Sequence, residues 1–426
     1  MLKKLFVVIL LCLSTNGIAQ ELTEKQKDSA RTAQDSIRKT EFIKSIGNGY
    51  LPFKYFDFDL RYLIKFNQYE GFRTGLGGIT NENFSKKYRI NAYTAYGFVD
   101  KRVKFGVGTG FRINEKTNTW VNLSYTDDLQ ESGSSNFLTD KRFFTFFEPR
   151  LLNIDLFHRH ITKALSIEHK LTNRLLSETE FASSAITPLY NYNYIFDGKS
   201  FDNFNIGTAK LSLQWSPFSK FELKDSRIVE TKNGYPKFTL QATQGFRSVL
   251  GSDFKFSKLD FRTVHQFNHK NSSKTDITLV AGIADGEVPL THLYHAYPNN
   301  INKQTILQRF SVAGLNSFET MYFNEFFSDK FSTLQLKHFF KPFNITERFK
   351  PQLVLISRYA VGDMKSINRH QGINFNTLNH LYSESGIEIN KLIFGFGLSF
   401  AYRYGAYHLP NLEDNMAFKF TFNLSI

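Results

Sequence analysis

Two short segments of the sequence carry paired histidines, a residue type that often binds metals at neutral pH. "FHRH" contains His158 and His160, and "HLYH" contains His292 and His295. Two imidazoles at this spacing could hold a metal ion. However, no carboxylate stands beside them at helical spacing, and the H-E-x-x-H pattern does not occur in the sequence. We therefore interpret these histidines as polar loop residues and predict no metal site.

Other catalytic and cofactor patterns are equally weak. A serine nucleophile in a G-x-S-x-G elbow is not found in the sequence. "GVGTG" places Gly106, Gly108 and Gly110 at a period of two, whereas a dinucleotide fingerprint needs a strand, a tight turn and a helix. Cys12 is the only cysteine, which excludes disulfides within the chain. The sequence predicts no catalytic residues, no cofactor and no enzymatic activity.

The three glycines instead belong to a segment with the alternation of a β-strand. In "KFGVGTGFRI", and again in "FGFGLSFAYRY", large apolar residues occupy one parity while glycine, small and charged residues occupy the other. Successive side chains of a strand point to opposite faces, so each segment has one apolar and one polar face. Aromatic residues on the apolar face are typical of outer-membrane barrels. We predict an all-β fold, a transmembrane antiparallel β-barrel, whose lumen-facing glycines leave room for an interior element.

The last nine residues, "FKFTFNLSI", show the same pattern in its purest form. We predict that this strand closes the barrel on the first strand and that Lys419 faces the lumen, where replacement by Gln is tolerated. Replacing Phe420 by Arg near the bilayer midplane is expected to destabilise the barrel. The residues predicted to face lipid are Phe418, Phe420, Phe422, Leu424 and Ile426.

The number of strands supports this architecture. We predict about sixteen, an even number, as bacterial single-chain barrels require. Long connections at 128–162, 185–203, 285–330 and 361–379 are expected outside the cell and short turns in the periplasm, although the connection at 217–235 breaks this rule. The predicted strands are about 54–66, 70–79, 88–97, 103–113, 119–127, 163–171, 174–184, 204–216, 236–246, 255–269, 273–284, 331–341, 350–360, 380–389, 393–405 and 417–426.

The N-terminus is typical of an exported protein. Lys3 and Lys4 precede an apolar run of about nine residues and then Gly17 and Ala19, which predicts a signal peptide over 1–19. The run is too short for a spanning helix, which needs about 20 residues. Residues 20–50 are charged and are predicted to form a periplasmic linker or short helix, so the barrel occupies 51–426.

The charge of the chain bears on its partners. The formal net charge is +14, but the basic residues are dispersed along the strands and no nucleic-acid-binding motif occurs in the sequence. We therefore predict no nucleic-acid partner and expect anionic outer-membrane lipid or lipopolysaccharide instead. The mean hydropathy is negative and no second apolar run approaches spanning length, which excludes a helical membrane protein.

Two segments carry a resemblance to a known family. "LRYLIKFNQYEGFRTGLGGITNENFSKKYRINAYTAYGFVDKRVKFG" and "LNSFETMYFNEFFSDKFSTLQLKHFF" resemble the barrel region of an uncharacterised outer-membrane protein family of Bacteroidota. The longer members of that family carry a carboxypeptidase-regulatory-like domain before the barrel. The resemblance implies fold and location, namely the outer membrane of a Gram-negative bacterium, and implies no activity.

A more distant resemblance concerns the longest loop. Sixteen strands with the longest loop between strands eleven and twelve are similar to the surface-antigen barrels, which include outer-membrane insertases and two-partner secretion transporters. In those proteins an arginine of this loop meets an acidic residue of the wall near strand thirteen. The resemblance implies that Arg309 in "QRFS" meets Asp363 in "AVGD", although the glycine of the Arg-Gly-aromatic loop tip of those proteins is missing here. The alternative is an exposed loop whose arginine is solvated.

These observations lead to one predicted function and two alternatives. We predict transport, secretion or an outer-membrane assembly role, with the 285–330 loop gating or plugging the lumen and the barrel assembly machinery as a partner. The first alternative is a non-transporting, surface-exposed structural or binding barrel. The second is an outer-membrane hydrolase, for which the sequence offers no positive support. The transported substrate is not identified by the sequence.

Overall fold

Alternating strands build one large antiparallel sheet in this protein. The computed structural model describes residues 49–138, 149–224, 227–346, 349–393 and 395–422. The predicted signal peptide, nearly all of the predicted linker, Leu424 and Ile426 lie outside these residues. Within them no helix is both long and apolar enough to cross a membrane.

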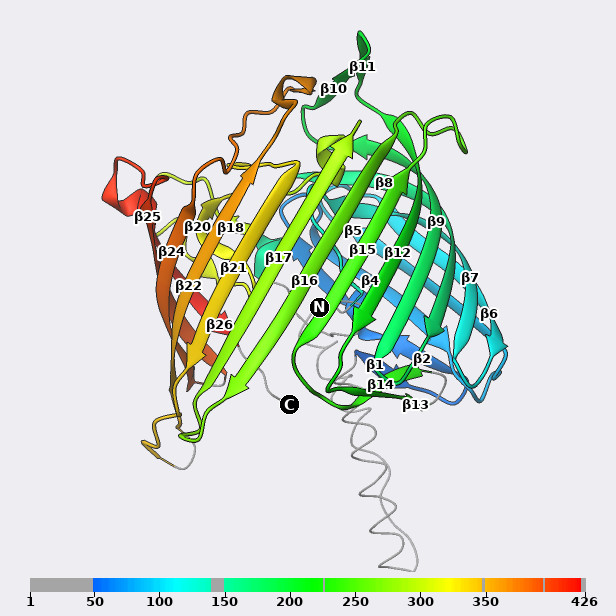
Figure 1. Cartoon of the computed structure of the whole chain (residues 1–426), viewed down its shortest axis with the longest axis horizontal. Helices are drawn as coiled ribbons and strands as arrows, with labels where there is room; N and C mark the ends of the chain where they lie inside the picture. The colour runs from blue at the N-terminus through cyan, green and yellow to red at the C-terminus, as the bar shows by residue number, and fades with distance from the viewer. Residues whose placement is uncertain (1–48, 139–148, 225–226, 347–348, 394, 423–426) are drawn as a thin grey trace, which may run out of the picture. The chain divides into compact units, whose positions relative to one another are not determined.

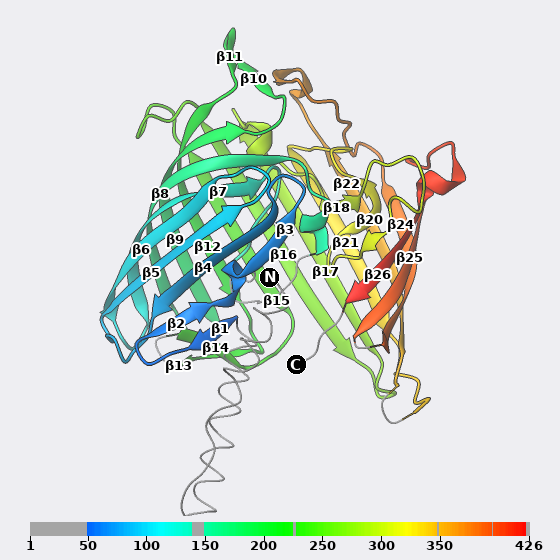
Figure 2. The ribbon, with the colours of Figure 1, turned by 180° about the vertical axis from the view of Figure 1, so that it is seen from behind.

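The wall strands run obliquely and curve around a common interior (Figures 1 and 2). Each pairs with its neighbour in the chain in an antiparallel ladder. Counting β2 and β3 as one strand, which the 3₁₀ helix η1 (Leu60–Tyr62) interrupts, the described residues form sixteen wall strands, as predicted. In chain order they are β2 (Phe56–Asp59) with β3 (Ile64–Asn67), β4 (Gly71–Thr80), β5 (Tyr88–Gly97), β6 (Val103–Asn114), β7 (Thr119–Glu131), β8 (Phe157–Lys170), β9 (Leu175–Pro188), β12 (Phe204–Trp215), β15 (Lys237–Gly245), β16 (Phe256–Asn268), β17 (Lys274–Gly286), β21 (Lys330–Phe339), β22 (Gln352–Asp363), β24 (Tyr382–Ile393), β25 (Phe396–Gly405) and β26 (Met416–Phe422).

The two faces of the wall differ as the alternation predicts. On β26, Phe418 and Phe420 are more than 40% exposed, whereas Lys419 between them is 1% exposed. On β24, Ile387 is exposed and Glu384 is fully buried. The apolar parity therefore faces outward, where a bilayer would cover it, and the polar parity faces the lumen.

The shorter elements lie in the connections. The connection that breaks the predicted loop rule contains a separate hairpin, β13 (Lys220–Lys224) and β14 (Arg227–Lys232), which explains its length without moving any wall strand. At the end with the long loops, β10 (Asn193–Phe196) pairs with both β11 (Lys199–Phe201) and β23 (His370–Gln371). The remaining elements are β1 (Tyr50–Pro52), β18 (Pro298–Asn300), β19 (Ser311–Val312), β20 (Phe318–Tyr322) and the 3₁₀ helices η3 (Pro149–Leu152), η4 (Leu290–His292), η5 (Ile367–Arg369) and η6 (Leu412–Asn415).

The sheet is not closed between its first and last strands, so the predicted closure of β26 on the first strand is wrong for the described residues. The free edge of β26 instead pairs in parallel with β19, with Ser311 opposite Lys419 and Val312 opposite Phe420. At the other edge, β1 pairs with β2. Each edge thus pairs over part of its length with another short segment of the chain, and the cylinder stays unclosed among the described residues.

The largest buried apolar cluster lies where the long loops meet the inner wall. Leu290, Tyr294, Phe318 and Met321 of the 285–330 loop pack there with wall residues such as Tyr382. A wall glycine makes this approach possible at one point, because a Cβ on Gly282 would lie 2.6 Å from the Tyr294 ring. Gly106, Gly108 and Gly110 instead accommodate Tyr93, Asn91 and Asn122 of neighbouring strands. The glycine of β17 therefore makes room for the loop, whereas the glycines of β6 make room for side chains of neighbouring wall strands.

Candidate functional site

The candidate site is the contact between the 285–330 loop and the inner wall of the last four strands. Within this loop, β18 and β20 form a parallel pair that places β20 against the wall. The wall presents buried charged residues from four successive strands on the lumen parity, and one residue of each strand contacts the loop. These residues are Arg358 of β22, Glu384 of β24, Arg403 of β25 and Lys419 of β26.

Glu319 of β20 is the loop residue at the centre of this contact. Its Oε2 lies 3.1 Å from Lys419 Nζ, and its Oε1 lies 4.0 Å from an Arg358 nitrogen. The same carboxylate accepts hydrogen bonds from Asn299 Nδ2 at 2.8 Å and Ser317 Oγ at 2.8 Å. Glu319 is fully buried, yet its oxygens are provided with charged and neutral donors.

Glu384 of β24 is the wall residue that binds the backbone of the loop. Its two oxygens accept hydrogen bonds from the backbone N–H groups of Glu319 and Thr320, each at 2.9 Å, and from Thr320 Oγ1 at 2.6 Å. Arg358 Nη1 donates to Glu384 at 2.6 Å. Glu319, Arg358, Glu384 and Lys419, here called the lumen charge cluster, thus contain two negative and two positive charges.

The electrostatics favour the ionised form of the loop carboxylate. Burial alone would raise the pKa of Glu319, but Lys419 and Arg358 lower it by attraction and Ser317 and Asn299 lower it by hydrogen bonding. The net pKa lies below the ordinary value of a glutamate. The loop carboxylate is therefore ionised at neutral pH.

Two further ion pairs extend the contact. Arg403 of β25 donates to Glu325 of the loop at 2.7 Å. Arg309 of the loop pairs with Asp414 at 2.9 Å and also contacts the hydroxyl of Tyr322. Besides the lumen charge cluster, these two pairs fix the 285–330 loop to β25 and to η6.

The predicted pairing of Arg309 with Asp363 is wrong. The structure places Asp363 at the end of β22, where it lies 3.4 Å from Lys330 and is about half exposed. Arg309 is almost fully buried, but its partner, Asp414, lies in η6 before the last strand. The physical reason is that β19 pairs with β26 directly after Arg309, which holds this part of the loop beside the last strand.

The residues predicted to face lipid are only partly described. Phe418 and Phe420 lie on the exposed face of β26, where Phe418 packs against Phe400 and Phe420 against Phe310 of the loop. Phe422 is half-buried beside Phe396, with ring centroids 4.8 Å apart. Leu424 and Ile426 lie outside the described residues. Lipid contact by these side chains stays a prediction.

The structure brings three of the four candidate histidines together. The ring centroids of His158 and His160 are 6.4 Å apart, as are those of His158 and His292. His295 instead bonds Glu131 at 2.7 Å. The described part of the chain contains no group of three or more His, Cys, Asp or Glu side chains placed to hold a metal ion.

Sequence reasoning missed the lumen charge cluster, although a signal was present. Once the strand parity is set, Arg358, Glu384, Arg403 and Lys419 are charges on the inward parity of four successive strands. Buried charges of this kind need partners. An acid inside the longest loop, such as Glu319 in "SFETMYF", was the missing counterpart.

Comparisons with known proteins agree with this fold. The model of one protein family, described as the C-terminal domain of a family of unknown function, DUF5686, matches residues 52–347. The structure is similar to BamA from Haemophilus ducreyi lacking POTRA domains 1–3, with a TM-score of 0.54 and 10% sequence identity over 95% of this chain and 79% of that chain. CdiB from Escherichia coli gives a TM-score of 0.44 and 9% identity over 83% of this chain and 60% of that chain. No curated protein matches the chain by sequence.

Proposed function

The chain belongs to the DUF5686 family, and on this premise we propose that it is an outer-membrane barrel that transports or assembles a substrate, with the 285–330 loop as a releasable plug of its lumen. The proposal places the protein in the outer membrane of a Gram-negative bacterium after export by the signal peptide at 1–19. The long loops then lie outside the cell. A bacterium of the Bacteroidota as source, and the barrel assembly machinery as a partner, stay predictions.

The observation that carries the proposal is the charged nature of the contact that holds the loop. A loop that fills the lumen permanently would be held at least as well by apolar side chains, because a buried ion pair is often no more stabilising than a hydrophobic replacement of similar volume. Here Arg358, Glu384, Arg403 and Lys419 line the wall behind the loop. If the loop leaves, water can solvate these charges, so a wet lumen costs less here than behind an apolar contact.

A second observation concerns where the loop meets the edge of the sheet. β19 pairs with β26 through only two register positions, and Ala313 N donates to Phe420 O at 2.7 Å. A short pairing of this kind is released at small cost compared with the long ladders of the wall. The same movement would therefore open the lumen and free the edge of β26.

The test is a reversible covalent link between the loop and β26. Val312 and Phe420 are opposite one another on adjacent strands, a separation compatible with a disulfide after V312C and F420C substitution. Cys12, the native cysteine, lies in the segment predicted to be removed on export. We expect the oxidised double variant to block conductance in a planar bilayer and reduction to restore it. E319Q should conduct more than the wild type, whereas K365Q, which removes an exposed charge, should not.

The alternative is a barrel with a permanently filled lumen that serves a structural or binding role. It is favoured by the balanced charges and complete burial of the lumen charge cluster. In that case the reduced double variant and E319Q would both remain non-conducting while still folded, as judged by heat-modifiable migration. The proposal includes no catalytic step. A hydrolase function would be supported by hydrolytic activity that persists when the loop is linked to β26.

A further inference from the structure

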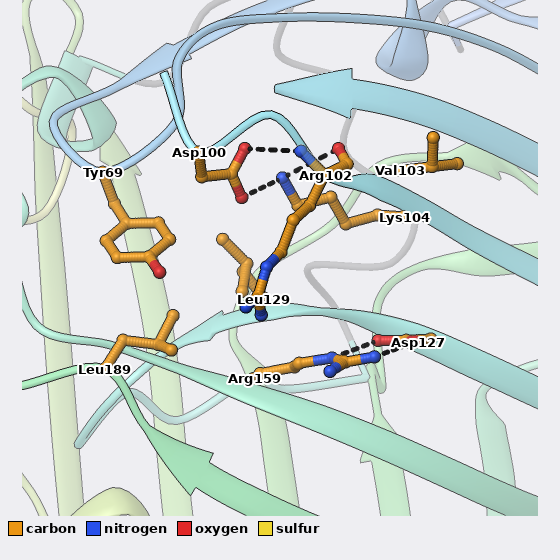
Figure 3. Close-up of a pocket in the computed structure, with 9 residues that line it drawn as sticks. All are labelled: Tyr69, Asp100, Arg102, Val103, Lys104, Asp127, Leu129, Arg159 and Leu189. Atoms are coloured by element: carbon orange, nitrogen blue, oxygen red, sulfur yellow. Dashed lines mark hydrogen bonds and ion pairs between the residues drawn. The ribbon is translucent and has the colours of Figure 1, made fainter. Parts of the chain in front are cut away.

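A pocket of about 210 Å³, lined by none of the residues of the lumen charge cluster, lies at the end of the wall that carries the long loops. It is formed by the β3–β4 turn with Tyr69, the β5–β6 turn with Arg102, the last part of β7 with Leu129, and the start of β8 with Arg159 (Figure 3). Leu189, just after β9, completes it.

Most of the strand residues that line the pocket lie on the outward parity, on the side of the wall that a bilayer covers. On β7, Asp127 and Leu129 share their parity with Leu123, which is 57% exposed. On β8, Arg159 shares its parity with Ile167, which is also exposed. Among the strand residues of the lining, Lys104 of β6 is the one on the inward parity, where it is 3% exposed.

Aromatic side chains on the outward face indicate where the pocket lies relative to the membrane. Phe105 and Tyr125 stand two residues closer to the middle of the wall than Val103 and Asp127, on the same outward face, and their rings stack with centroids 5.8 Å apart. Outer-membrane barrels carry such aromatic girdles at the boundary between hydrocarbon and headgroups. The charged side chains of the pocket then lie close to this boundary, where a charge costs much less than at the midplane.

The pocket contains donors that the described residues do not use. Arg159 pairs with Asp127 through Nε at 2.8 Å and Nη2 at 2.5 Å, which leaves Nη1 available. The Arg102 guanidinium points toward this pair from the other side of the pocket (Figure 3). Among the described residues, no side-chain hydrogen bond or ion pair engages the Arg102 guanidinium or the Tyr69 hydroxyl.

The acids in the pocket already have cationic partners. Asp127 is held by Arg159, and Asp100 by Lys104, which also lies 2.7 Å from Glu70. Among the charged side chains that line the pocket, three are positive and two are negative. The unshared positive charge is that of Arg102.

We propose that this pocket binds the phosphate of an anionic lipid of the outer leaflet. Arg102 and Arg159 Nη1 donate charge-assisted hydrogen bonds to the phosphate oxygens, and the Tyr69 hydroxyl donates a third. Val103 and Leu129 contact the first apolar carbons of the lipid. The inference rests on the proposed function only for the orientation of the barrel, with the long loops outside.

The experiment measures lipid binding by the purified full-length protein in detergent, using native mass spectrometry. The probes are bis-phosphorylated lipid A, the same lipid after removal of both phosphates, and inorganic phosphate. We expect lipid A to bind and the dephosphorylated lipid to bind about tenfold or more weakly, because charge-assisted hydrogen bonds are lost. Inorganic phosphate at millimolar concentration should not displace lipid A.

Matched variants assign the binding to this pocket. R102Q should weaken lipid A binding about tenfold. Since R159Q alone leaves Asp127 unpaired, D127N/R159Q is the second variant, and it should weaken binding similarly. R174Q, at an exposed arginine in the turn between β8 and β9 at the opposite end of the wall, is the control and should bind as the wild type does.

Wild-type affinity in R102Q and D127N/R159Q would overturn the proposal, as would displacement of lipid A by inorganic phosphate. Loss of binding in R174Q to the same degree would also overturn it, because the effect would then be general charge attraction. The conductance of the V312C and F420C variant does not depend on this pocket. Failure of the lipid site and failure of the plug are therefore separate results.

Discussion

Lys419 of the last wall strand and Glu319 of the 285–330 loop form a fully buried ion pair, with Nζ and Oε2 3.1 Å apart. The ammonium group also donates to the backbone oxygen of Asn299. The sequence correctly predicts that Lys419 faces inward, but its pairing with Glu319 gives this residue a different role from the one expected. Lys419 is a binding partner of the loop and not a solvated residue of the lumen.

The first prediction follows from this pair. Lys419→Gln should destabilise the protein by about 3–5 kcal/mol, since it leaves Glu319 without its nearest counter-charge in a buried site. This reverses the expectation from the sequence that the change is tolerated. Unfolding in urea, followed by heat-modifiable migration, measures the effect. Lys365→Gln removes an exposed partner of Asp285 and should cost less than about 1 kcal/mol; equal losses in the two variants would contradict the assignment.

The second prediction concerns the outward face of β26. Phe420→Arg should cost about 2–4 kcal/mol near the bilayer midplane. Part of any loss would come from its edge-to-face contact with Phe310, whose ring centroid lies 4.5 Å away. The readout is the yield of heat-modifiable barrel in the membrane fraction. Leu412→Arg, in the exposed η6, is the control, and a tolerated Phe420→Arg would remove the lipid-facing assignment.

The third prediction concerns accessibility from outside the cell. Single cysteines at Ser134, Asn302 and Asn368 should react with a membrane-impermeant maleimide on whole cells, whereas a cysteine at Asn173 should not. Asn300, which the loop assignment from sequence alone predicts to be accessible, is fully buried in β18 and should be protected. Labelling of Asn173 on intact cells, with Ser134 and Asn368 protected, would invert the orientation of the barrel.

The same labelling can report release of the loop. A cysteine at Asn300 should become reactive when Glu319→Gln is added, because Glu319 accepts the hydrogen bond from the neighbouring Asn299 side chain at 2.8 Å. Protection that persists in the double variant would mean that removing this charge does not release the loop.

The fourth prediction is a pH dependence from His292 of η4. Burial lowers the pKa of His292 to about 3, and the neighbouring Lys258 and His160 lower it in the same direction. The unfolded chain takes up a proton near pH 6.5 while the folded chain does not, so stability is full above pH 6.5. It then falls with decreasing pH at up to about 1.4 kcal/mol per unit, down to pH 3. Urea unfolding between pH 7 and pH 4 measures this slope.

His292→Phe should make this part of the stability profile less steep, because one titrating group is removed while a ring of similar shape remains beside Phe256. His380→Gln, at an exposed loop position, should leave the slope unchanged. An unchanged slope in His292→Phe would show that another group controls the acid sensitivity.

The wall strands were predictable from the sequence because apolar and polar residues alternate within each strand, one set for each face of the wall. The predicted strand at 103–113 and the observed β6 differ by one residue, since alternation and turn residues are both local signals. β8 begins at Phe157, before the predicted residue 163, because "FHRH" has no apolar parity to mark its outward face. Polar strand ends that contact loops do not show the alternation on which the prediction depends.

The lumen charge cluster could not be predicted in the same way. Its members come from the loop and from three wall strands, and their pairing depends on how far each strand is staggered against the next. The sequence also suggested Arg309 as the anchor because its neighbours resemble a known motif, whereas the deeply buried anchor is an acid, Glu319, with cations on the wall. A motif identifies a residue type, but only the packed structure shows where the counter-charge lies.

The wall residues that hold Glu319, namely Arg358, Glu384 and Lys419, all stand later in the chain than the 285–330 loop itself. Glu319 is synthesised before Arg358, Glu384 and Lys419, and β19 is synthesised before the strand with which it pairs. The loop therefore cannot reach its final position until β26 has been inserted. Protection of the loop from protease should therefore appear only once β26 is in place, so that the loop itself reports the position of the last strand.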